Sequence, residues 1–370
     1  MKTTAFEPIG ELWDTIQSYL FPILEDEIGV LDEKHREFMA VCELCAPQNY
    51  TDAYRWVGNG CPPHSRLALC KAFIAKAVWN FATTRALIDA IRHRPALRRL
   101  CGWESLGEVP SESTFSRAFD AFAHDSLPQR IHETLIKNHY SNKIVGHISR
   151  DATAVHARER AECKPQQPPS KKEPIKRGRR SKGEPAPPPA LTRLQQQLQR
   201  NLEENLNDLP TACNWGCKKN SQGKIEQWRG YKGHLDVADG DIPISFILTS
   251  ASLHDSQVAI PLAQMTAERV TNLYDLADAA YDAKEIREIS ARLGHVAIID
   301  NNPRRGEKII FSPAEAQRYK ERSAVERVNS HLHEEHGGRN LRVCGSVKVA
   351  AHLAFGLLVI ATEQMFRMLA

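Results

Sequence analysis

The sequence lacks a long hydrophobic run. Its most apolar stretch, residues 349–361, is interrupted by His352 and is shorter than the roughly 20 residues that a membrane-spanning helix needs. The first seventeen residues carry three acidic side chains and no apolar segment of the kind that a secretory signal contains. We therefore expect a soluble, intracellular protein with no membrane partner.

Cysteine does not occur in a number or pattern that suggests disulfides. Nine cysteines, an odd number in a chain of 370 residues, fit a reducing compartment better than a disulfide framework. Cys42 and Cys45, together with Cys213 and Cys217, could supply four thiolates to zinc, but a long stretch of chain separates the two pairs. Ordinary structural thiols are the favoured interpretation.

Excess charge is nearly absent outside one segment. The chain has a net charge of +4, whereas residues 164–184 alone hold eight Lys/Arg and two acidic residues, so the remainder has a net charge of −2. Residues 163–190 also hold eight of the 21 prolines, a composition that cannot form a packed core. This segment is either a solvated linker or a contact for the DNA backbone through its basic cluster, Lys176, Arg177, Arg179 and Arg180.

The first 140 residues are predicted to be helical. Apolar residues recur every three or four positions over residues 66–81 and 115–122, the second stretch after a Pro-Ser helix start, and residues 127–140 are a further helix candidate. Short helices in series are typical of a helix-turn-helix-like DNA-binding module, and equally of a plain helical bundle. We assign residues 1–140 to a helical N-terminal domain and residues 141–370 to a second domain.

The pattern changes to strands at Ile144. A β-type run is predicted to end at Arg150-Asp151, a Leu/Gln-rich amphipathic helix to cover residues 191–209, and a hairpin to turn at Asp239-Gly240. Alternating helices and strands follow, and two long helices, over residues 313–336 and 346–368, finish the chain. This order predicts an α/β fold with a mixed sheet flanked by helices.

Three acidic residues occupy positions where such a fold exposes side chains. Asp151 and Asp278 follow predicted strands, and Glu326 lies on the penultimate helix. Carboxylates gathered without basic partners repel one another, so a cluster of them indicates a site for hard divalent cations. Tyr319, Arg322, Glu326 and His333 would share one helix face, although Arg322 and Glu326 alone could be an ordinary surface pair.

The ordered set of motifs resembles bacterial insertion-sequence transposases of the DDE type, which carry a Tyr-x2-Arg-x3-Glu-x6-Lys signature. The resemblance covers about residues 144–366. The matching segments are residues 150–153 (RDAT), 228–234 (WRGYKGH), 252–256 (SLHDS), 278–282 (DAAYD) and 319–326 (YKERSAVE), with Asn329.

The resemblance implies a ribonuclease H-like catalytic core in which Asp151, Asp278 and Glu326 hold two Mg²⁺ (or Mn²⁺) ions. It further implies that Arg322 contacts DNA phosphate, that Tyr319 positions the terminal nucleotide, and that His254 and Asp255 support the site. The chain departs from the signature at His333, where the family has Lys or Arg; a neutral imidazole holds phosphate less firmly.

The implied function is that of a transposase, a metal-dependent endonuclease and strand transferase for DNA recombination. It would bind the terminal inverted repeats of its insertion sequence, cleave the 3′ ends and join them to target DNA, as a homodimer in the DNA complex. We expect it in the bacterial cytoplasm, at the nucleoid. The alternatives are a catalytically weakened or domesticated DNA-binding protein and a divalent-metal nuclease without strand transfer.

The histidines near residue 333 do not have the spacing of a zinc site on one helix. His331, His333 and His336 adjoin Glu334 and Glu335, but a zinc-binding pair on one helix wants a spacing of four, and these histidines are two, three and five residues apart.

Overall fold

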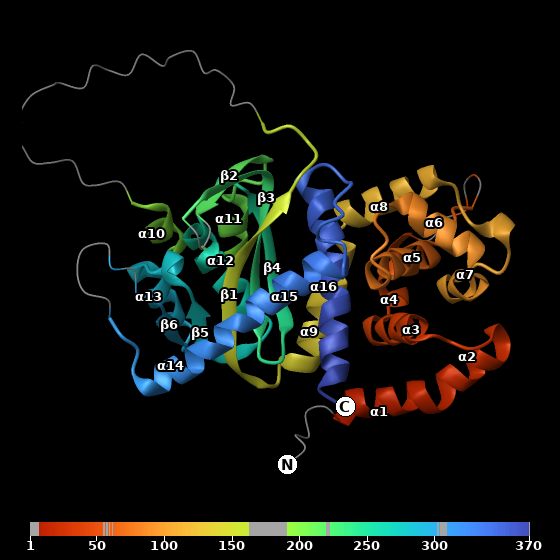
Figure 1. Ribbon diagram of the computed structural model, residues 1–370, viewed down its shortest axis with the longest axis horizontal. Helices are drawn as coiled ribbons and strands as arrows, with labels where there is room; N and C mark the ends of the chain where they lie inside the picture. Colours follow the sequence, from red (N-terminus) through yellow and green to blue (C-terminus); the bar gives the residue numbers. More distant parts are fainter. Residues whose placement is uncertain are drawn as a thin grey trace, which may run out of the picture.

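A computed structural model describes residues 7–54, 56, 58, 60, 62–162, 191–219, 223–301, 303 and 309–369. Within these residues a helical N-terminal region and a sheet lie on either side of one long helix, α16 (Ser346–Arg367) (Figure 1). The predicted basic Pro-rich segment and its residues Lys176, Arg177, Arg179 and Arg180 lie outside the described residues.

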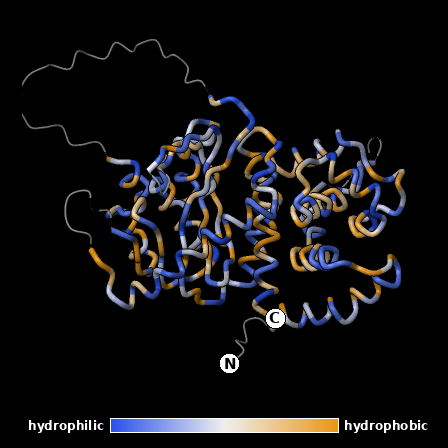
Figure 2. The backbone as a smooth tube through the Cα atoms, in the orientation of Figure 1, coloured by the Kyte–Doolittle hydropathy of each residue, from blue (hydrophilic) through white to orange (hydrophobic). Residues whose placement is uncertain are grey.

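The N-terminal region is helical up to residue 140, and the three helices predicted there are present. Hydrophobic and hydrophilic positions alternate along these helices, as expected when each buries one face (Figure 2). The elements are α1 (Glu7–Thr15), η2 (Ile16–Leu20), α2 (Phe21–Ile28), α3 (Glu33–Cys45), α4 (Gln48–Thr51), η3 (Asp52–Tyr54), α5 (Arg66–Val78), α6 (Thr84–His93), α7 (Pro95–Cys101), η4 (Leu106–Glu108), α8 (Glu112–His124) and α9 (Leu127–Tyr140).

The sheet is mixed and has six strands, which confirms the predicted fold class. Its central strand β1 has β3 as an antiparallel neighbour on one side and β5 as a parallel neighbour on the other. β2 and β4 pair with β3, and β6 pairs with β5. The strands are β1 (Ile144–His156), β2 (Asn214–Lys219), β3 (Ile225–Ala238), β4 (Ile242–Ser250), β5 (Thr271–Ala277) and β6 (Val296–Ile299).

β1 is longer than the sequence predicted. The run was expected to end at Asp151, but β3 pairs with β1 as far as His156. On the other side, the pairing with β5 stops at Arg150. Asp151 therefore lies within a strand, at the position where one of its two neighbouring strands ends.

Two predicted long helices are interrupted. Residues 191–209 form α10 (Arg193–Gln197) and α11 (Leu202–Asn207), because Asn201 starts a new helix with a capping box to Glu204. The leucines still dock on the body, against α12 (Ala259–Ala267) and α13 (Lys284–Arg292). Residues 313–336 form α14 (Pro313–Tyr319), the 3₁₀ turn η7 (Lys320–Arg322) and α15 (Ser323–Glu334).

Helix α16 joins the two halves of the molecule. One continuous apolar core contains residues of the N-terminal helices, of β1 and β4, and of α16. By length and composition α16 is the one helix of the described residues that could span a membrane, and 72% of its apolar window is buried inside the protein. Packing against the protein's own core accounts for its hydrophobicity. The predicted boundary at residue 140 stays a prediction.

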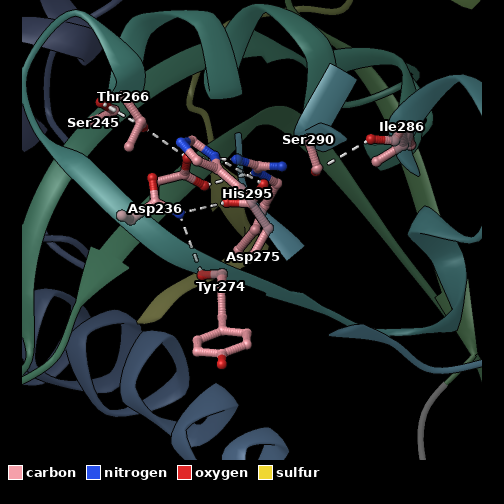
Figure 3. Close-up of polar contacts among 10 residues, drawn as sticks. Asp236, Ser245, Thr266, Tyr274, Asp275, Ile286, Ser290 and His295 are labelled. Carbon is pink, nitrogen blue, oxygen red and sulfur yellow. Dashed lines mark hydrogen bonds and ion pairs between the residues drawn. The ribbon is translucent and has the colours of Figure 1, made fainter. Parts of the chain in front are cut away.

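Beneath the sheet's centre lies a buried charged pair. Arg150 on β1 donates from Nε and Nη2 to the two carboxylate oxygens of Asp236 on β3, both at 2.7 Å, and the two residues are register partners. Thr266 of α12 donates to Asp236 at 2.7 Å, and its hydroxyl oxygen is hydrogen-bonded to the Ser245 hydroxyl at 2.9 Å (Figure 3). Neither side chain of the pair is more than 2% exposed. The two parallel hydrogen bonds give each buried charge a partner of opposite sign.

Removing one partner of this pair should destabilise the fold strongly. Arg150→Ala leaves Asp236 buried without its counter-charge, and we expect a loss of about 3–5 kcal/mol in the free energy of unfolding. Urea unfolding followed by circular dichroism measures it. Arg85→Ala, which removes only an exposed ion pair with Glu112, is the matched control and should change stability little. Equal losses in the two variants would contradict the assigned role of the buried pair.

Three buried histidines should make stability depend on pH. Burial lowers the pKa of His132 to about 3, that of His234 to about 4 and that of His352 to about 3. Histidines of the unfolded chain titrate near pH 6.5, so below that pH the unfolded state binds protons that the folded state does not. Stability should be complete above about pH 7 and fall toward pH 4, by about 1.4 kcal/mol per pH unit for each histidine.

Unfolding free energies measured between pH 5 and 7 test this dependence. In the variant His132→Gln, the unfolding free energy should change less steeply with pH, by the contribution of one histidine. The same replacement at the exposed His124 should leave the slope unchanged. A His132→Gln slope equal to that of the parent chain would show that His132 is protonated in the folded state.

Candidate active site

Asp151 and Asp278 lie next to each other where the pairing of the parallel strands β1 and β5 stops: Asp151 is still within β1, and Asp278 directly follows β5. The residues before them, Arg150 and Ala277, are the last register pair of β1 and β5. Asp278 leaves the strand and starts the 3₁₀ turn η6 (Ala279–Tyr281), where its Oδ1 accepts the backbone N–H of Ala280 at 2.9 Å. Side chains at such strand ends leave the core and line a crevice.

The alternation of β1 directs Asp151 to the face covered by η7 and α15. Arg150 points into the opposite face, toward α12. On the face of Asp151, Ser149 Oγ donates to the backbone oxygen of Glu321 at 2.8 Å, and Thr153 Oγ1 is hydrogen-bonded to His333 Nε2 at 2.9 Å. These two hydrogen bonds flank Asp151 and hold the segment that carries Glu326 across it.

Glu326 lies in the first turn of α15 and accepts a hydrogen bond from Arg322 Nη2. Arg322 also attracts the carboxylate of Asp151. Burial raises the pKa of the Tyr319 hydroxyl to about 12; Arg322 opposes this shift, whereas Asp278 and Glu326 add to it. The charges of all three acids thus act on Arg322 or Tyr319, and Arg322 links Glu326 to Asp151.

The sequence predicted that the signature residues share one helix face. In the structure they do not lie on one continuous helix. Tyr319 ends α14, Arg322 belongs to the 3₁₀ turn η7, and Glu326 and His333 belong to α15. The 3₁₀ turn nevertheless keeps Arg322 against both neighbours, with its guanidinium 5.9 Å from the centre of the Tyr319 ring.

Surplus negative charge marks the site. Burial, together with the charges of Asp278 and Asp255, raises the pKa of Asp151 to about 6, against the opposing effects of the Ala152 backbone N–H and the charge of Arg322. Carboxylates packed this way suit a hard divalent cation, which takes oxygen ligands. The carboxylate oxygens of Asp151, Asp278 and Glu326 do not all lie within 4.8 Å of one another. Among the described residues, the three potential metal ligands that do lie this close are in another place, at His331, His336 and Glu363.

Asp255, whose charge acts on Asp151, forms an ion pair with Lys232. Lys232 Nζ donates to Asp255 Oδ1 and to the backbone oxygen of Leu253, both at 2.8 Å. His254 instead turns its ring toward Ser256, at the start of the 3₁₀ turn η5 (Asp255–Val258). Lys232 was not among the predicted site residues, although it lies inside the motif of residues 228–234.

His333 is held against the sheet. Its Nε2 is hydrogen-bonded to Thr153, and burial, assisted by Arg339, lowers its pKa below the usual value. The imidazole at this position is therefore a neutral group packed on β1.

Two other carboxylates close to Asp278 in the sequence, Asp275 and Asp282, have structural partners. Asp275 is buried and is hydrogen-bonded to His295 and Asn272 (Figure 3). Asp282 accepts a hydrogen bond from Arg287 at 2.9 Å, and the N-cap of the following helix α13 is Ala283.

The two cysteine pairs do not meet. Cys42 and Cys45 are buried in the core of the N-terminal helices, and Cys213 in a separate core beside β3. Cys217 is exposed. These positions match the structural thiols that the sequence favoured.

Family models match two parts of the chain. A transposase domain model (DUF772) matches residues 25–121, within the N-terminal helices, and a transposase DDE domain model matches residues 192–361, which contain Asp278 and Glu326. No curated protein and no solved structure matches the chain significantly. The mixed sheet flanked by helices is consistent with the ribonuclease H-like core of a DDE domain. The two matches together cover well over half of the chain, which belongs to the DDE-type transposases of insertion sequences.

Proposed function

We propose that this chain binds the terminal inverted repeats of an insertion sequence, cleaves the 3′ ends of the element and joins them to target DNA. The observation that carries the proposal is the meeting of Asp151, Asp278 and Glu326, from three distant segments, around one space that contains Arg322. Acidic side chains that lie close together and outnumber the basic ones destabilise a fold, because like charges repel, so this cluster indicates a functional role.

The three acids would hold two Mg²⁺ or Mn²⁺ ions. Oxygen-only donors suit these ions, and the charges that raise the Asp151 pKa are those that a cation would neutralise. Bound there, the ions would supply Lewis acidity for an in-line displacement at phosphorus. Asp255, fixed by Lys232, adds negative charge behind Asp151.

Arg322 and Tyr319 would position the DNA. A guanidinium binds phosphate oxygens through two parallel hydrogen bonds, and Arg322 already lies between Asp151 and Glu326. Tyr319, about half buried beside Arg322, offers a ring on which a terminal base can stack. His333, packed on Thr153, contributes less to a phosphate contact than the Lys or Arg of the family signature would.

The rest of the chain would deliver the DNA. The N-terminal helices would recognise the element's ends, and the basic cluster of residues 176–180 would add salt-dependent attraction to phosphates. Two ends must be brought together, so a homodimer is expected in the DNA complex, at the nucleoid of the bacterial cytoplasm. The packing of His333 favours one alternative, a transposase weakened in catalysis that still binds DNA.

Removal of single acids should abolish cleavage. Asp151→Asn, Asp278→Asn and Glu326→Gln should each reduce Mg²⁺-dependent nicking of a plasmid carrying the element's ends by at least about 10²-fold, because each removes charge that the reaction needs. Asp282→Asn is the matched control, since its carboxylate is nearby and pairs with Arg287. Nicking by all three variants at the parent's rate would contradict the assignment.

Precut ends separate the remaining alternatives. Supplied with 3′-hydroxyl ends, the parent protein should join them to target DNA. Cleavage without joining would indicate a nuclease, and end binding without either reaction a weakened DNA-binding protein.

Restoring the signature cation should strengthen DNA binding. His333→Lys places an ammonium where the family signature has its cation. We expect tighter binding to the element's ends, and a plot of log binding constant against log salt concentration whose slope is steeper by about one. Gel-shift titrations at several salt concentrations measure both quantities. His139→Lys adds the same charge on α9, just before the amino end of β1 and away from the strand position that carries Asp151, and is the control. Equal behaviour of the two variants would show that position 333 does not approach DNA.

A further inference from the structure

A second cluster of potential metal ligands lies at the far end of α15. His331 of α15, His336 just beyond it and Glu363 of α16 place one ligand atom each within 4.8 Å of the others. Nε2 of His336 is 3.5 Å and Nε2 of His331 is 3.8 Å from Glu363 Oε2. The three side chains are only 1%, 14% and 10% exposed, respectively, for His336, His331 and Glu363.

The ring of His336 is oriented as a metal ligand would be. Its Nδ1 lies 3.2 Å from the backbone oxygen of Ala77, an acceptor, so Nδ1 carries a proton and donates it. Nε2 is buried and makes no hydrogen bond among the described residues. In the neutral ring this Nε2 presents its lone pair to a carboxylate oxygen, an arrangement that needs a cation or a proton between the two atoms. Metal-binding histidines are typically fixed by this kind of outer hydrogen bond.

The distances suit a tetrahedral ion. Ligand atoms about 2.0–2.1 Å from a tetrahedral zinc ion lie roughly 3.3 Å from one another, close to the 3.5 and 3.8 Å found here. Two imidazoles and a carboxylate are typical zinc ligands, whereas Mg²⁺ and Ca²⁺ prefer oxygen alone. Glu335 Oε2 lies 3.2 Å from His331 Nε2 at the exposed rim and can supply a fourth donor.

We propose that His331, His336 and Glu363 bind one structural Zn²⁺ ion, with Glu335 or water as the fourth ligand. The ion would tie the end of α15 to α16 and, through the Ala77 carbonyl, to α5 of the N-terminal helices. It is separate from the carboxylate site, since Glu326 and His331 are five positions apart on α15, about 7.5 Å along the helix axis and on different sides of the helix. The proposal does not depend on the catalytic function.

Zinc binding by the full-length chain tests the proposal. The metal-free protein is titrated with Zn²⁺ in excess Mg²⁺, which occupies the carboxylates, and metal content is then measured after dialysis. We expect one tightly held zinc per chain and an X-ray absorption spectrum of the parent protein with two imidazole ligands. Zinc should also raise the melting temperature.

Matched variants locate the ion. His331→Gln and Glu363→Gln should weaken zinc binding by at least about 100-fold and remove the thermal shift. His333→Gln, on the same helix but facing Thr153, should keep both, as should Asp151→Asn combined with Asp278→Asn. Retention of zinc by His331→Gln and Glu363→Gln, or a parent protein without bound zinc, would overturn the proposal. The parent's absorption spectrum decides by itself if a variant fails to fold: a spectrum without imidazole would equally overturn it.

Discussion

The ion pair between Arg150 and Asp236 is the constraint on which the site depends. Successive side chains of a strand point to opposite faces, so fixing Arg150 in the core beside α12 turns Asp151 to the face of α15. A slip of one residue between β1 and β3 would bury Asp151 and expose Arg150. Because the guanidinium binds both oxygens of its register partner, the slipped arrangement would leave two charges unpaired, and the sheet retains the register that presents the acid.

The position of Glu326 is determined by contacts elsewhere on its segment. Ser149 holds the backbone of Glu321, Thr153 holds His333, and Arg327 binds both oxygens of Asp241 at 2.6 and 2.8 Å. None of these contacts involves the Glu326 carboxylate, which is free to exchange its partner Arg322. A rigid helix with a replaceable contact at its acid is suited to a site that must admit ions and DNA.

Local patterns predicted the elements, and long-range contacts determined what the patterns missed. Periodicity identified α5 and α8, and the order of the predicted strands and helices identified the mixed sheet. The extension of β1 beyond Asp151 depends on β3, which pairs with it from about 80 residues away, and periodicity carries no such information. The cluster at His336 was missed because the spacing rule assumes one continuous helix; α15 ends at Glu334, and Glu363 comes from another helix.

Electrostatics links the parts of the candidate site to one another. Glu326 is bound by Arg322, which also attracts Asp151, while Asp278 and Asp255 act on Asp151 with the same sign. Lys232 pairs with Asp255, and the single guanidinium of Arg322 cannot neutralise the other three carboxylates. Asp151, Asp278 and Glu326 would hold a divalent cation, which would supply the missing positive charge, and Arg322 would then be available to bind a phosphate. Metal and DNA would thus each favour binding of the other, a coupling that follows from the placement of Arg322 between two acids.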